Sequence, residues 1–569
     1  MSLEHLIAVA RGDQPADLLL RNGRIVNVYS GEILDGDIAV ADGHIAGFGA
    51  REAHAVVDLQ GRFVAPGYVD AHVHIESAMA SPQEFARAVL PHGTTTVVAD
   101  PHEIANVLGM AGIAYMLEAT ERLPLQFMFA LSSCVPATFM ETAGAELKAE
   151  DLAPLISHPR VVALAEMMNF PGAIQGDAAV LDKIRLAREA RKRVDGHAPG
   201  VKGPALDAYI AAGIASDHEC ITATEAMEKL RRGMHIMIRE GTGAKNMEAL
   251  LDIIRPDTVA RLMWCTDDRH PHDILTEGHI DAIVRKAIGH GVPPHLAIRM
   301  ATLNPTAYFG LRQTGAIAPG QRGDMVVFSR LEAPQVEAVY AGGQLVAKNG
   351  EIVDEALFPD VTPPAPAMNV NTETLAFQLS AKKEQIRVID IVPGQIVTRQ
   401  AIHTATVIDG RAVADPSRDL LKIAVVERHR GSGRTGIGFV KGVGLQRGAI
   451  ASSVAHDAHN IIVVGADDQD MEAAVRRVAE MQGGLVAICN QEVMADLALP
   501  IAGLMSPEPV QWIQHRLDAL IQATQRLGSP LPDPFMTLSF LALPVIPDLK
   551  ITDLGLVDVN RFEPVDLFC

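Results

Sequence analysis

Apolar and polar residues follow two different rhythms along the first part of this chain. From about residue 17 to residue 65 they alternate between turns, as in DLLLRNGRIVNV and VVDLQGRFVAPG, which predicts short antiparallel strands. From residue 68 to about residue 304, short apolar runs alternate with longer amphipathic stretches, which predicts repeated strand and helix units. Eight strands are predicted, at residues 68–75, 94–100, 126–132, 161–166, 193–198, 213–219, 234–240 and 261–268. Eight such units over roughly 250 residues are typical of a (β/α)₈ TIM-like barrel.

The strand rhythm returns after the predicted barrel, in TGAIAPGQRGDMVVFS and VEAVYAGGQLVAKNG. We therefore expect residues 1–67 and 306–357 to pair as one small β-sandwich domain, with the barrel of residues 68–305 inserted in it. Residues 358–379, which begin with a Pro-rich stretch, are expected to form a linker. Residues 380–569 carry mixed strand and helix signals, as in NIIVVGADDQDMEAAVRRVAEMQGGLVAIC, and predict a separate α/β or α+β domain.

Composition narrows the class of protein. The 569 residues are 48% hydrophobic, yet charge or glycine interrupts each apolar run before the roughly 18 residues that a membrane span needs. The first residues lack a secretory pattern, so we expect a cytoplasmic enzyme that binds no membrane. The formal net charge of -20 repels nucleic acid, and a small molecule is the expected partner. The five cysteines are scattered without a C-x-x-C pair, so any metal ion must be held by histidine and carboxylate.

Ionisable residues stand at the ends of the predicted barrel strands. His72 and His74 are two residues apart at the end of the first strand, and the period of two points both side chains to the same side. Four more residues end other strands: Glu166, His197, His218 and Asp267. Barrel enzymes place their chemistry at this end of the strands. Four imidazoles and two carboxylates are therefore predicted to converge on one mouth.

An H-x-H pair alone is weak support for a metal site, because two such histidines can equally be structural. The acidic residues in apolar strands favour a metal site, since a buried carboxylate is costly unless it is paired or bound to metal. Six ligands exceed what one open catalytic ion normally uses, so two ions fit better than one. Ligand type alone does not separate Zn from Mn or Fe.

Two motifs in the C-terminal region admit several interpretations. The segment SSVAHDAHN (452–460) is rich in site-forming residue types, but its spacing favours a hydrogen-bonded structural turn. The segment RGSGRTGIGFVKG (430–442) is glycine-rich and basic, yet it lacks the order of a P-loop. We interpret it as turns between strands that fold over the active-site mouth.

Several motifs together resemble those of a known enzyme family. VAPGYVDAHVHIE (64–76), MATLNPTAYFGL and GAIAPGQRGDMVVF resemble the opening and closing segments of the amidohydrolase superfamily. Within it, the chain resembles the adenine deaminases in segments that extend into the C-terminal domain: DPHEIANVLG (100–109), AEMMNFPG (165–172), DGHAPG (195–200), SDHE (216–219), CTDDRHP (265–271) and VAHDAHNIIVVG (454–465). One departure from the commoner superfamily pattern is Glu166, which stands where many members carry a carboxylated lysine that bridges two metals.

The resemblance implies deamination of adenine to hypoxanthine in purine salvage, by a homodimer or higher homo-oligomer. It implies two divalent ions per subunit, with Mn or Fe favoured and Zn as an alternative, and the ligand set His72, His74, Glu166, His197, His218 and Asp267. Metal-activated water would attack C6 of adenine, and Asp267 would pass a proton to the departing amine. A different metal amidohydrolase, acting on a cyclic amide or an N-acyl amino acid, is the main alternative. A barrel without catalysis, serving as a scaffold, is less favoured because no ligand is missing.

Further roles are expected next to these ligands. Glu219 and Glu103 are the candidates for protonating the purine ring, although Glu219 can equally orient His218. His102, Arg269 and His270 are the candidate substrate contacts. The alternative for His102 and Glu103 is a structural role in their loop, and the alternative for Arg269 is a solvated side chain.

Overall fold

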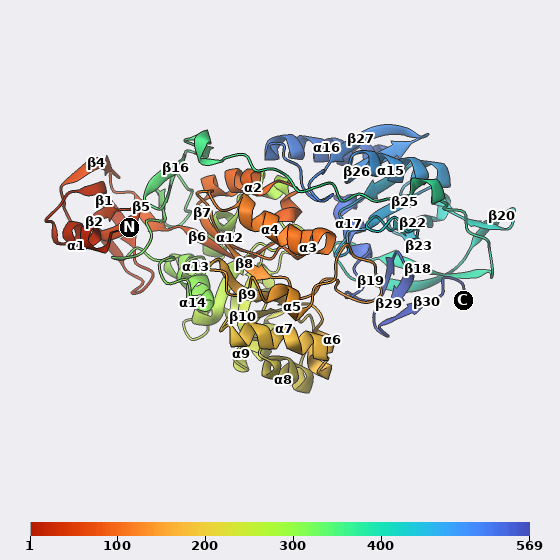
Figure 1. Ribbon diagram of the computed structural model, residues 1–569, viewed down its shortest axis with the longest axis horizontal. Coiled ribbons are helices and arrows are strands. Elements are labelled where there is room, and N and C mark those ends of the chain that lie inside the picture. The colour runs from red at the N-terminus through yellow and green to blue at the C-terminus, as the bar shows by residue number, and fades with distance from the viewer. Residues whose placement is uncertain (1) are drawn as a thin grey trace.

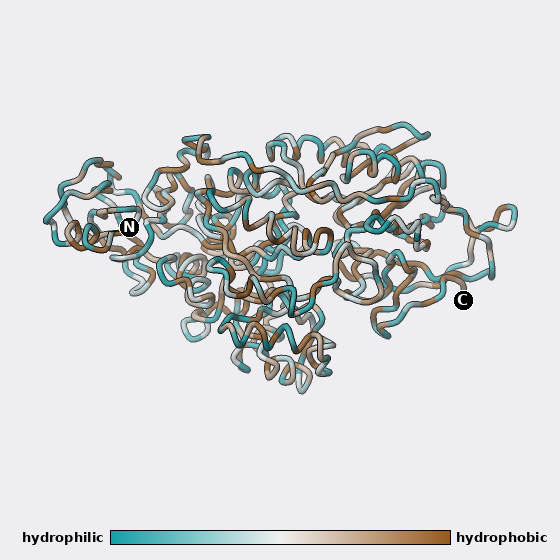
Figure 2. The backbone as a smooth tube through the Cα atoms, in the orientation of Figure 1, coloured by the Kyte–Doolittle hydropathy of each residue, from teal (hydrophilic) through white to brown (hydrophobic). Residues whose placement is uncertain are grey.

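The computed structural model describes residues 2–569, which form three parts arranged along the longest axis of the molecule (Figure 1). The small β domain lies at the left, the α/β part in the middle and the C-terminal domain at the right. Hydrophobic residues concentrate on the interior strands and hydrophilic residues on the outer turns (Figure 2). Among the described residues, no helix combines the length and the apolar character needed to cross a bilayer.

The α/β part contains a strand within each of the eight predicted ranges. The strands are β6 (Tyr68–Val73), β7 (Thr94–Ala99), β8 (Gln126–Leu131), β9 (Val161–Met167), β10 (Arg193–Gly196), β11 (Ser216–Asp217), β12 (His235–Arg239) and β13 (Leu262–Cys265). They form a five-stranded sheet, β6 to β10, and a three-stranded sheet, β11 to β13, in which all pairs are parallel. A parallel bridge between Val73 and Asp267 joins the end of β6 to the chain just after β13. This curled parallel arrangement fits a TIM-like barrel.

Several of the helices that follow the strands begin at polar capping residues or at prolines. Ser81 accepts a hydrogen bond from the Glu84 amide at the start of α2, and Asp177 accepts one from Val180 at the start of α7. The α-helices of this part are α2 (Pro82–Val89), α3 (His102–Leu108), α4 (Met110–Ala119), α5 (Ala149–Leu152), α6 (Phe170–Gln175), α7 (Ala178–Glu189), α8 (Gly203–Ala212), α9 (Ala223–Arg231), α10 (Met247–Leu250), α11 (Pro271–Thr276), α12 (Ile280–Gly289), α13 (Pro294–Met300) and α14 (Leu303–Phe309).

The small β domain is built from two distant segments, as the alternation predicts. Helix α1 (Leu3–Arg11) precedes strands β1 (Ala16–Val26), β2 (Ile33–Ala41), β3 (His44–Phe48), β4 (Ala53–Asp58) and β5 (Phe63–Pro66), and the later segment adds β14 (Met325–Phe328), β15 (Ala338–Ala341), β16 (Gln344–Lys348) and β17 (Glu351–Ile352). All nine strands share one hydrogen-bonded sheet, whereas the predicted sandwich implied two. The reason is β5, which pairs with β1 on one side and with β14 on the other.

The predicted linker crosses from the small β domain to the C-terminal domain along the α/β part (Figure 1). Between residues 358 and 379 its only regular element is a short 3-10 turn, Thr372–Thr374. Phe358 lies under the Arg87 guanidinium of α2, 4.4 Å from its carbon, and the Asn369 amide donates to the Arg428 carbonyl at 2.8 Å. The linker is therefore held against the α/β part and against the C-terminal domain.

The C-terminal domain contains an eight-stranded sheet with the order β19-β18-β23-β22-β25-β24-β26-β27. Only the β18 and β23 pair is parallel, so the domain is of the α+β kind rather than α/β. Its strands are β18 (Gln385–Ile391), β19 (Thr398–Thr404), β20 (Thr406–Ile408), β21 (Arg411–Val413), β22 (Leu421–Val426), β23 (Thr435–Lys441), β24 (Ala449–Ser452), β25 (Ile461–Gly465), β26 (Gly484–Cys489), β27 (Glu492–Ala498), β28 (Leu549–Thr552), β29 (Gly555–Asp558) and β30 (Glu563–Val565), and its helices are α15 (Asp468–Glu480), α16 (Val510–Leu527) and α17 (Pro534–Leu541).

This domain covers the ends of the parallel strands through contacts with the loop after β8. The Thr142 hydroxyl donates to the Asp553 carboxylate at 2.7 Å, and the Asn460 side chain donates to the Thr142 carbonyl at 2.8 Å. The Thr552 hydroxyl donates to the Met140 carbonyl at 2.6 Å. These buried hydrogen bonds dock the C-terminal domain onto the face where barrel enzymes carry their sites.

Lys550 in β28 offers a test of this packing. Its fully buried ammonium group donates to the carbonyls of Ile396 at 2.8 Å and Phe540 at 2.9 Å. Burial lowers its pKa to about 7, against the opposing charge of Asp548, whereas an unfolded lysine titrates near ~10.4. Between about pH 7 and ~10.4 the unfolded chain therefore binds more protons than the folded chain. The stability that depends on a neutral Lys550 is fully present above ~10.4 and is lost as the pH falls through 7.

We expect Lys550→Met to remove this pH dependence. The melting temperature of the wild type, relative to that of the variant, should rise as the pH rises from about 7 to about 9, because one such group changes the free energy of unfolding by up to about 1.4 kcal/mol per pH unit. Thermal melts of both proteins across this range measure the difference. Parallel curves would show that Lys550 does not titrate in this window.

Candidate active site

The six predicted ligands converge where the parallel strands end. His72 lies in β6 and His74 just after it, while Val73 between them joins the apolar core on the other side. Glu166 lies in β9, and the remaining three follow directly on strands, namely His197 after β10, His218 after β11 and Asp267 after β13. All six are buried, with at most 6% of each residue exposed.

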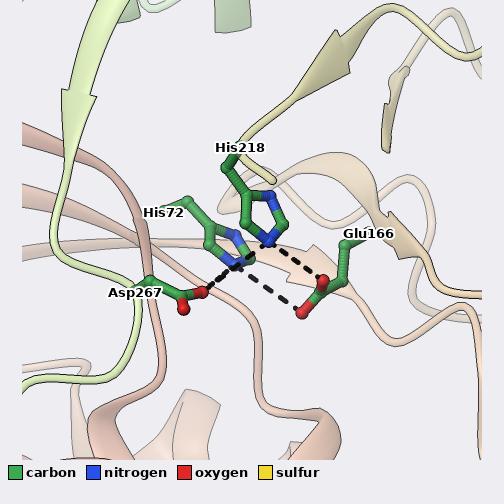
Figure 3. A group of neighbouring side chains, drawn as sticks. All are labelled: His72, Glu166, His218 and Asp267. Carbon is green, nitrogen blue, oxygen red and sulfur yellow. Dashed lines mark ion pairs between the residues drawn. The ribbon is translucent and has the colours of Figure 1, made fainter. Parts of the chain in front are cut away.

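Glu166 lies between two pairs of histidines, and Figure 3 shows one member of each pair, His72 and His218. Its Oε1 is 3.7 Å from His72 Nε2 and 3.3 Å from His74 Nε2. Its Oε2 is 2.7 Å from His197 Nδ1 and 3.2 Å from His218 Nε2. Each carboxylate oxygen thus faces one histidine pair, which is the arrangement that a carboxylate shared by two cations requires.

Asp267 completes the first of these groups. Its Oδ1 is 3.1 Å from His72 Nε2 and 3.3 Å from His74 Nε2, and its Oδ2 accepts from Arg239 at 2.9 Å. The backbone of Asp267 is in the left-handed region, with φ of 58°, and two backbone hydrogen bonds hold it there: its amide donates to the His72 carbonyl and its carbonyl accepts from the His74 amide. Such a conformation is uncommon outside glycine, but aspartate tolerates it.

The histidine tautomers suit metal binding. His74 Nδ1 lies 3.1 Å from the Asp100 carbonyl and must donate to it, which leaves the Nε2 lone pair free toward Glu166 and Asp267. His72 Nε2 is buried and forms no hydrogen bond within the described residues, although it points at the same carboxylates. A buried ring nitrogen without a partner is costly unless a ligand satisfies it.

Both carboxylates of the group are held in the ionised form that a metal ligand needs. Burial raises the pKa of Glu166, but the imidazoles around it, His218 first, outweigh burial and hold the pKa well below its ordinary value. Burial likewise raises the pKa of Asp267. The charge of Arg239 together with His72 and His74 outweighs burial, and the pKa lies well below its ordinary value. Imidazole nitrogens and carboxylate oxygens are donors for Mn, Fe and Zn ions, so the residues present fit two divalent cations.

A cavity lies beside this group. Its polar side carries the carboxylates of Glu219 and Asp268 beside those of Glu166 and Asp267. The C-terminal domain supplies an opposite wall that is largely apolar, with Ile396, Phe540, Leu543 and Ile546. A flat, partly apolar small molecule matches such a lining.

Glu219 is fixed by Arg239, a residue that sequence reasoning missed. The buried guanidinium binds Glu219 through both nitrogens, at 2.5 and 2.9 Å, and through one of them also binds Asp267. Burial raises the pKa of Glu219, but the Arg239 charge together with His197 and His218 outweighs burial, and the pKa lies below its ordinary value. Arg239 ends strand β12, one of the three strands whose ends supplied no predicted ligand, and that position is the signal that could have identified it.

The other predicted contacts divide into two groups. His102 and Glu103, at the start of α3, line the cavity. Arg269 does not: its guanidinium donates to the carbonyls of Gly278 and Glu240, so it braces the loop after β13. His270 is also absent from the lining, because its Nδ1 pairs with Asp533 at 3.2 Å in front of α17.

The segment 452–460 is more than the structural turn favoured by its spacing. His456 and Asp457 line the cavity, and the side chains of His456 and His459 both contact Glu103. The spacing could not reveal this, because the partner Glu103 lies in a different domain.

The glycine-rich segment 430–442 takes no part in the cavity lining. The Glu427 carboxylate accepts from the amides of Arg430 at 2.6 Å and Ser432 at 2.9 Å. A carboxylate thus occupies the place where a phosphate would bind, and β23 begins at Thr435. The interpretation as turns between strands is confirmed for residues 430–434, which connect β22 to β23, whereas residues 435–441 form β23 itself. The expected position over the mouth is wrong, because no residue of the segment lines the cavity.

Comparisons with known proteins agree with this architecture. Residues 63–346 match the amidohydrolase family, and residues 395–563 match the adenine deaminase C-terminal domain. The chain is 54% identical over 565 residues to an adenine deaminase of Desulfatibacillum aliphaticivorans, with 99% of each chain covered. It is 49% identical over 571 residues to an adenine deaminase of Methanothrix thermoacetophila, with 100% of each chain covered. The crystal structure of enamidase covers 58% of this chain and 96% of its own, with 20% identity and a TM-score of 0.46. Because identity near one half extends over both the ligand-bearing part and the C-terminal domain, the chain belongs to the adenine deaminase family.

Proposed function

We propose that this protein hydrolyses adenine to hypoxanthine and ammonia. The observation that carries the proposal is the position of Glu166 between two histidine pairs, in a chain that belongs to the adenine deaminase family. The buried cavity beside it has a polar side for reaction and an apolar wall for a flat base. A cytoplasmic role in purine salvage, in a homodimer or higher homo-oligomer, is part of the proposal.

We infer that the two parallel sheets close into one (β/α)₈ barrel. The Val73 bridge to Asp267 supports closure between β6 and β13. Closure places the six ligands on one ring of strand ends.

Two divalent ions are proposed at this ring, with Mn or Fe favoured and Zn as an alternative. His72, His74 and Asp267 would hold one ion, His197 and His218 the other, and Glu166 would contact both. When bound, such ions lower the pKa of water toward neutrality and so make hydroxide available near pH 7. The positive charge of these ions would also compensate the buried negative charges of Glu166 and Asp267.

The protein's own residues would move the two protons of the reaction. Water adds its oxygen to C6 of adenine, one of its protons ends on ring nitrogen N1, and the other leaves with the amine as ammonia. Asp267 is proposed to take a proton at Oδ1 and deliver it to the departing amine, while Arg239 fixes its other oxygen. Glu219, on the opposite side of the same guanidinium nitrogen, is proposed to carry the proton to N1.

An ammonia-release assay on purified, metal-analysed protein tests the proposed function. Adenine, adenosine, cytosine and N-acyl amino acids are offered side by side, and we expect turnover of adenine above all others. Turnover of a non-purine alone would overturn the assignment and favour a different metal amidohydrolase.

A further inference from the structure

The C-terminal domain supplies polar side chains to the catalytic cavity. His456 and Asp457 lie in the loop between β24 and β25, and both line the cavity although they are buried from solvent. The ring of His102 separates them from the metal-binding group: its Nδ1 is 3.8 Å from Glu166 Oε1, and its Nε2 is 3.9 Å from Asp457 Oδ1. The two residues therefore lie at the end of the cavity away from the proposed reaction centre.

Glu103 orients His456 across the domain boundary. Its Oε1 lies 2.8 Å from His456 Nδ1, and its Oε2 contacts His459 Nε2. The Ala455 amide donates to His459 Nδ1 at 3.1 Å, so the ring proton of a neutral His459 must be on Nε2, where it points at Glu103. A metal ligand needs an unprotonated nitrogen, so this tautomer excludes a cation held by His459 and Glu103 and makes the cluster a hydrogen-bonded anchor.

His456 presents its second ring nitrogen to the cavity. Its ring stacks on Phe540, with centroids 4.7 Å apart and planes 22° apart, so its plane is fixed. Among the described residues, its ring has no polar partner other than Glu103 at 2.8 Å and a distant Asp457 oxygen at 3.9 Å, both on the Nδ1 side. Burial lowers the pKa of His456, but the charge of Glu103, its hydrogen bond to the ring and the nearby aspartates together outweigh burial and raise the pKa to about 9, so Nε2 carries a proton and can donate.

Asp457 offers the complementary acceptor. Its Oδ2 is buried and has no hydrogen-bond partner within the described residues. An unpaired buried carboxylate oxygen costs several times more than an ordinary hydrogen bond contributes, so this atom calls for a donor from a ligand.

We propose that His456 and Asp457 form a recognition subsite for the edge of a free purine base that carries N3 and N9–H. His456 Nε2–H donates to N3, and the N9–H donates to Asp457. This edge lies on the opposite side of the purine from C6, which matches the separation of the subsite from the metal-binding group. A base substituted at N9 loses its donor and leaves Asp457 unpaired, so the subsite selects free bases over nucleosides. The inference rests on the proposed function and names the residues that define its substrate.

The test compares Asp457→Asn and His456→Gln with the wild type, each as metal-loaded full-length protein. Steady-state kinetics with adenine and with 9-methyladenine give KM and kcat separately, and calorimetric titration with hypoxanthine measures binding without turnover. We expect both variants to raise KM for adenine and Kd for hypoxanthine at least tenfold, with metal content unchanged and kcat affected less. The preference for adenine over 9-methyladenine should fall at least tenfold in Asp457→Asn.

Asp470→Asn is the matched control. Asp470 is a buried aspartate of the same domain whose carboxylate accepts the amides of Asn490 and Gln491, away from the cavity. It should keep the wild-type KM. If the wild type deaminates adenine but both subsite variants retain its KM and its preference, the subsite is wrong and the proposed function stands. If the wild type neither deaminates adenine nor binds hypoxanthine, the proposed function fails and the subsite with it.

Discussion

Glu166→Gln is expected to lose bound metal and at least about three orders of magnitude in turnover. The amide keeps the shape of the side chain but offers one neutral oxygen in place of two charged ones, so it cannot serve both histidine pairs. Without bound ions, the pKa of the attacking water rises from about 7 to the far higher value of bulk water, so little hydroxide is available. Metal analysis by mass spectrometry and ammonia release with adenine measure both consequences on one sample.

Glu141→Gln is the control for this variant. Glu141 is also a buried glutamate, but it lies outside the cavity lining and accepts the Thr138 amide at 3.1 Å, a bond that a glutamine oxygen can keep. It should keep its metal and its activity. A Glu166→Gln protein that carries two ions and turns over adenine normally would remove Glu166 from the proposed ligand set.

Asp267→Asn should reduce kcat by about 10²- to 10⁴-fold, the range typical of a lost acid and base group. The asparagine keeps an oxygen toward His72 and His74, so some metal should remain, whereas the proton acceptor is gone. The kinetic loss should therefore exceed the loss of metal when both are measured on the same preparation. Glu219→Gln, in the same assay, should lower kcat with metal content near that of the wild type.

Asp324→Asn separates these effects from a general loss of stability. Asp324 is buried near the small β sheet, where it accepts from Arg322 at 2.8 Å and from the Gly342 amide at 2.8 Å. Its loss should lower the melting temperature and leave kcat unchanged. If Asp267→Asn lost activity only in proportion to its metal, Asp267 would act as a ligand and not as a proton carrier.

Local patterning was sufficient to predict the strands and the ligand group. Side chains point to alternate sides along a strand, so His72 and His74 had to share one side. Parallel strands joined by helices end at one face. Glu166 and Asp267 therefore had to approach His72 and His74, although both lie far from that pair in the sequence. These relations depend on spacing along the chain and on the regular geometry of strands.

Contacts of individual side chains with distant parts of the chain could not be predicted in the same way. Arg269 looked like a substrate contact because it follows Asp267, but its guanidinium meets the carbonyls of Gly278 and Glu240, which only the folded loop brings within reach. Arg239 was overlooked although it pairs with both Glu219 and Asp267. Outside a regular strand or helix, the position of a residue next to a site residue does not determine where its side chain points.

The sequence by itself determined the family resemblance, the strand and helix order, and the residues of the proposed metal-binding group. Only the tertiary structure decided that the C-terminal domain closes the cavity and that Glu103 anchors His456. The physical reason is the range of the interactions. The periodic pattern of a strand or helix involves residues that are close in sequence, whereas a hydrogen bond between residues 103 and 456 depends on how two domains pack.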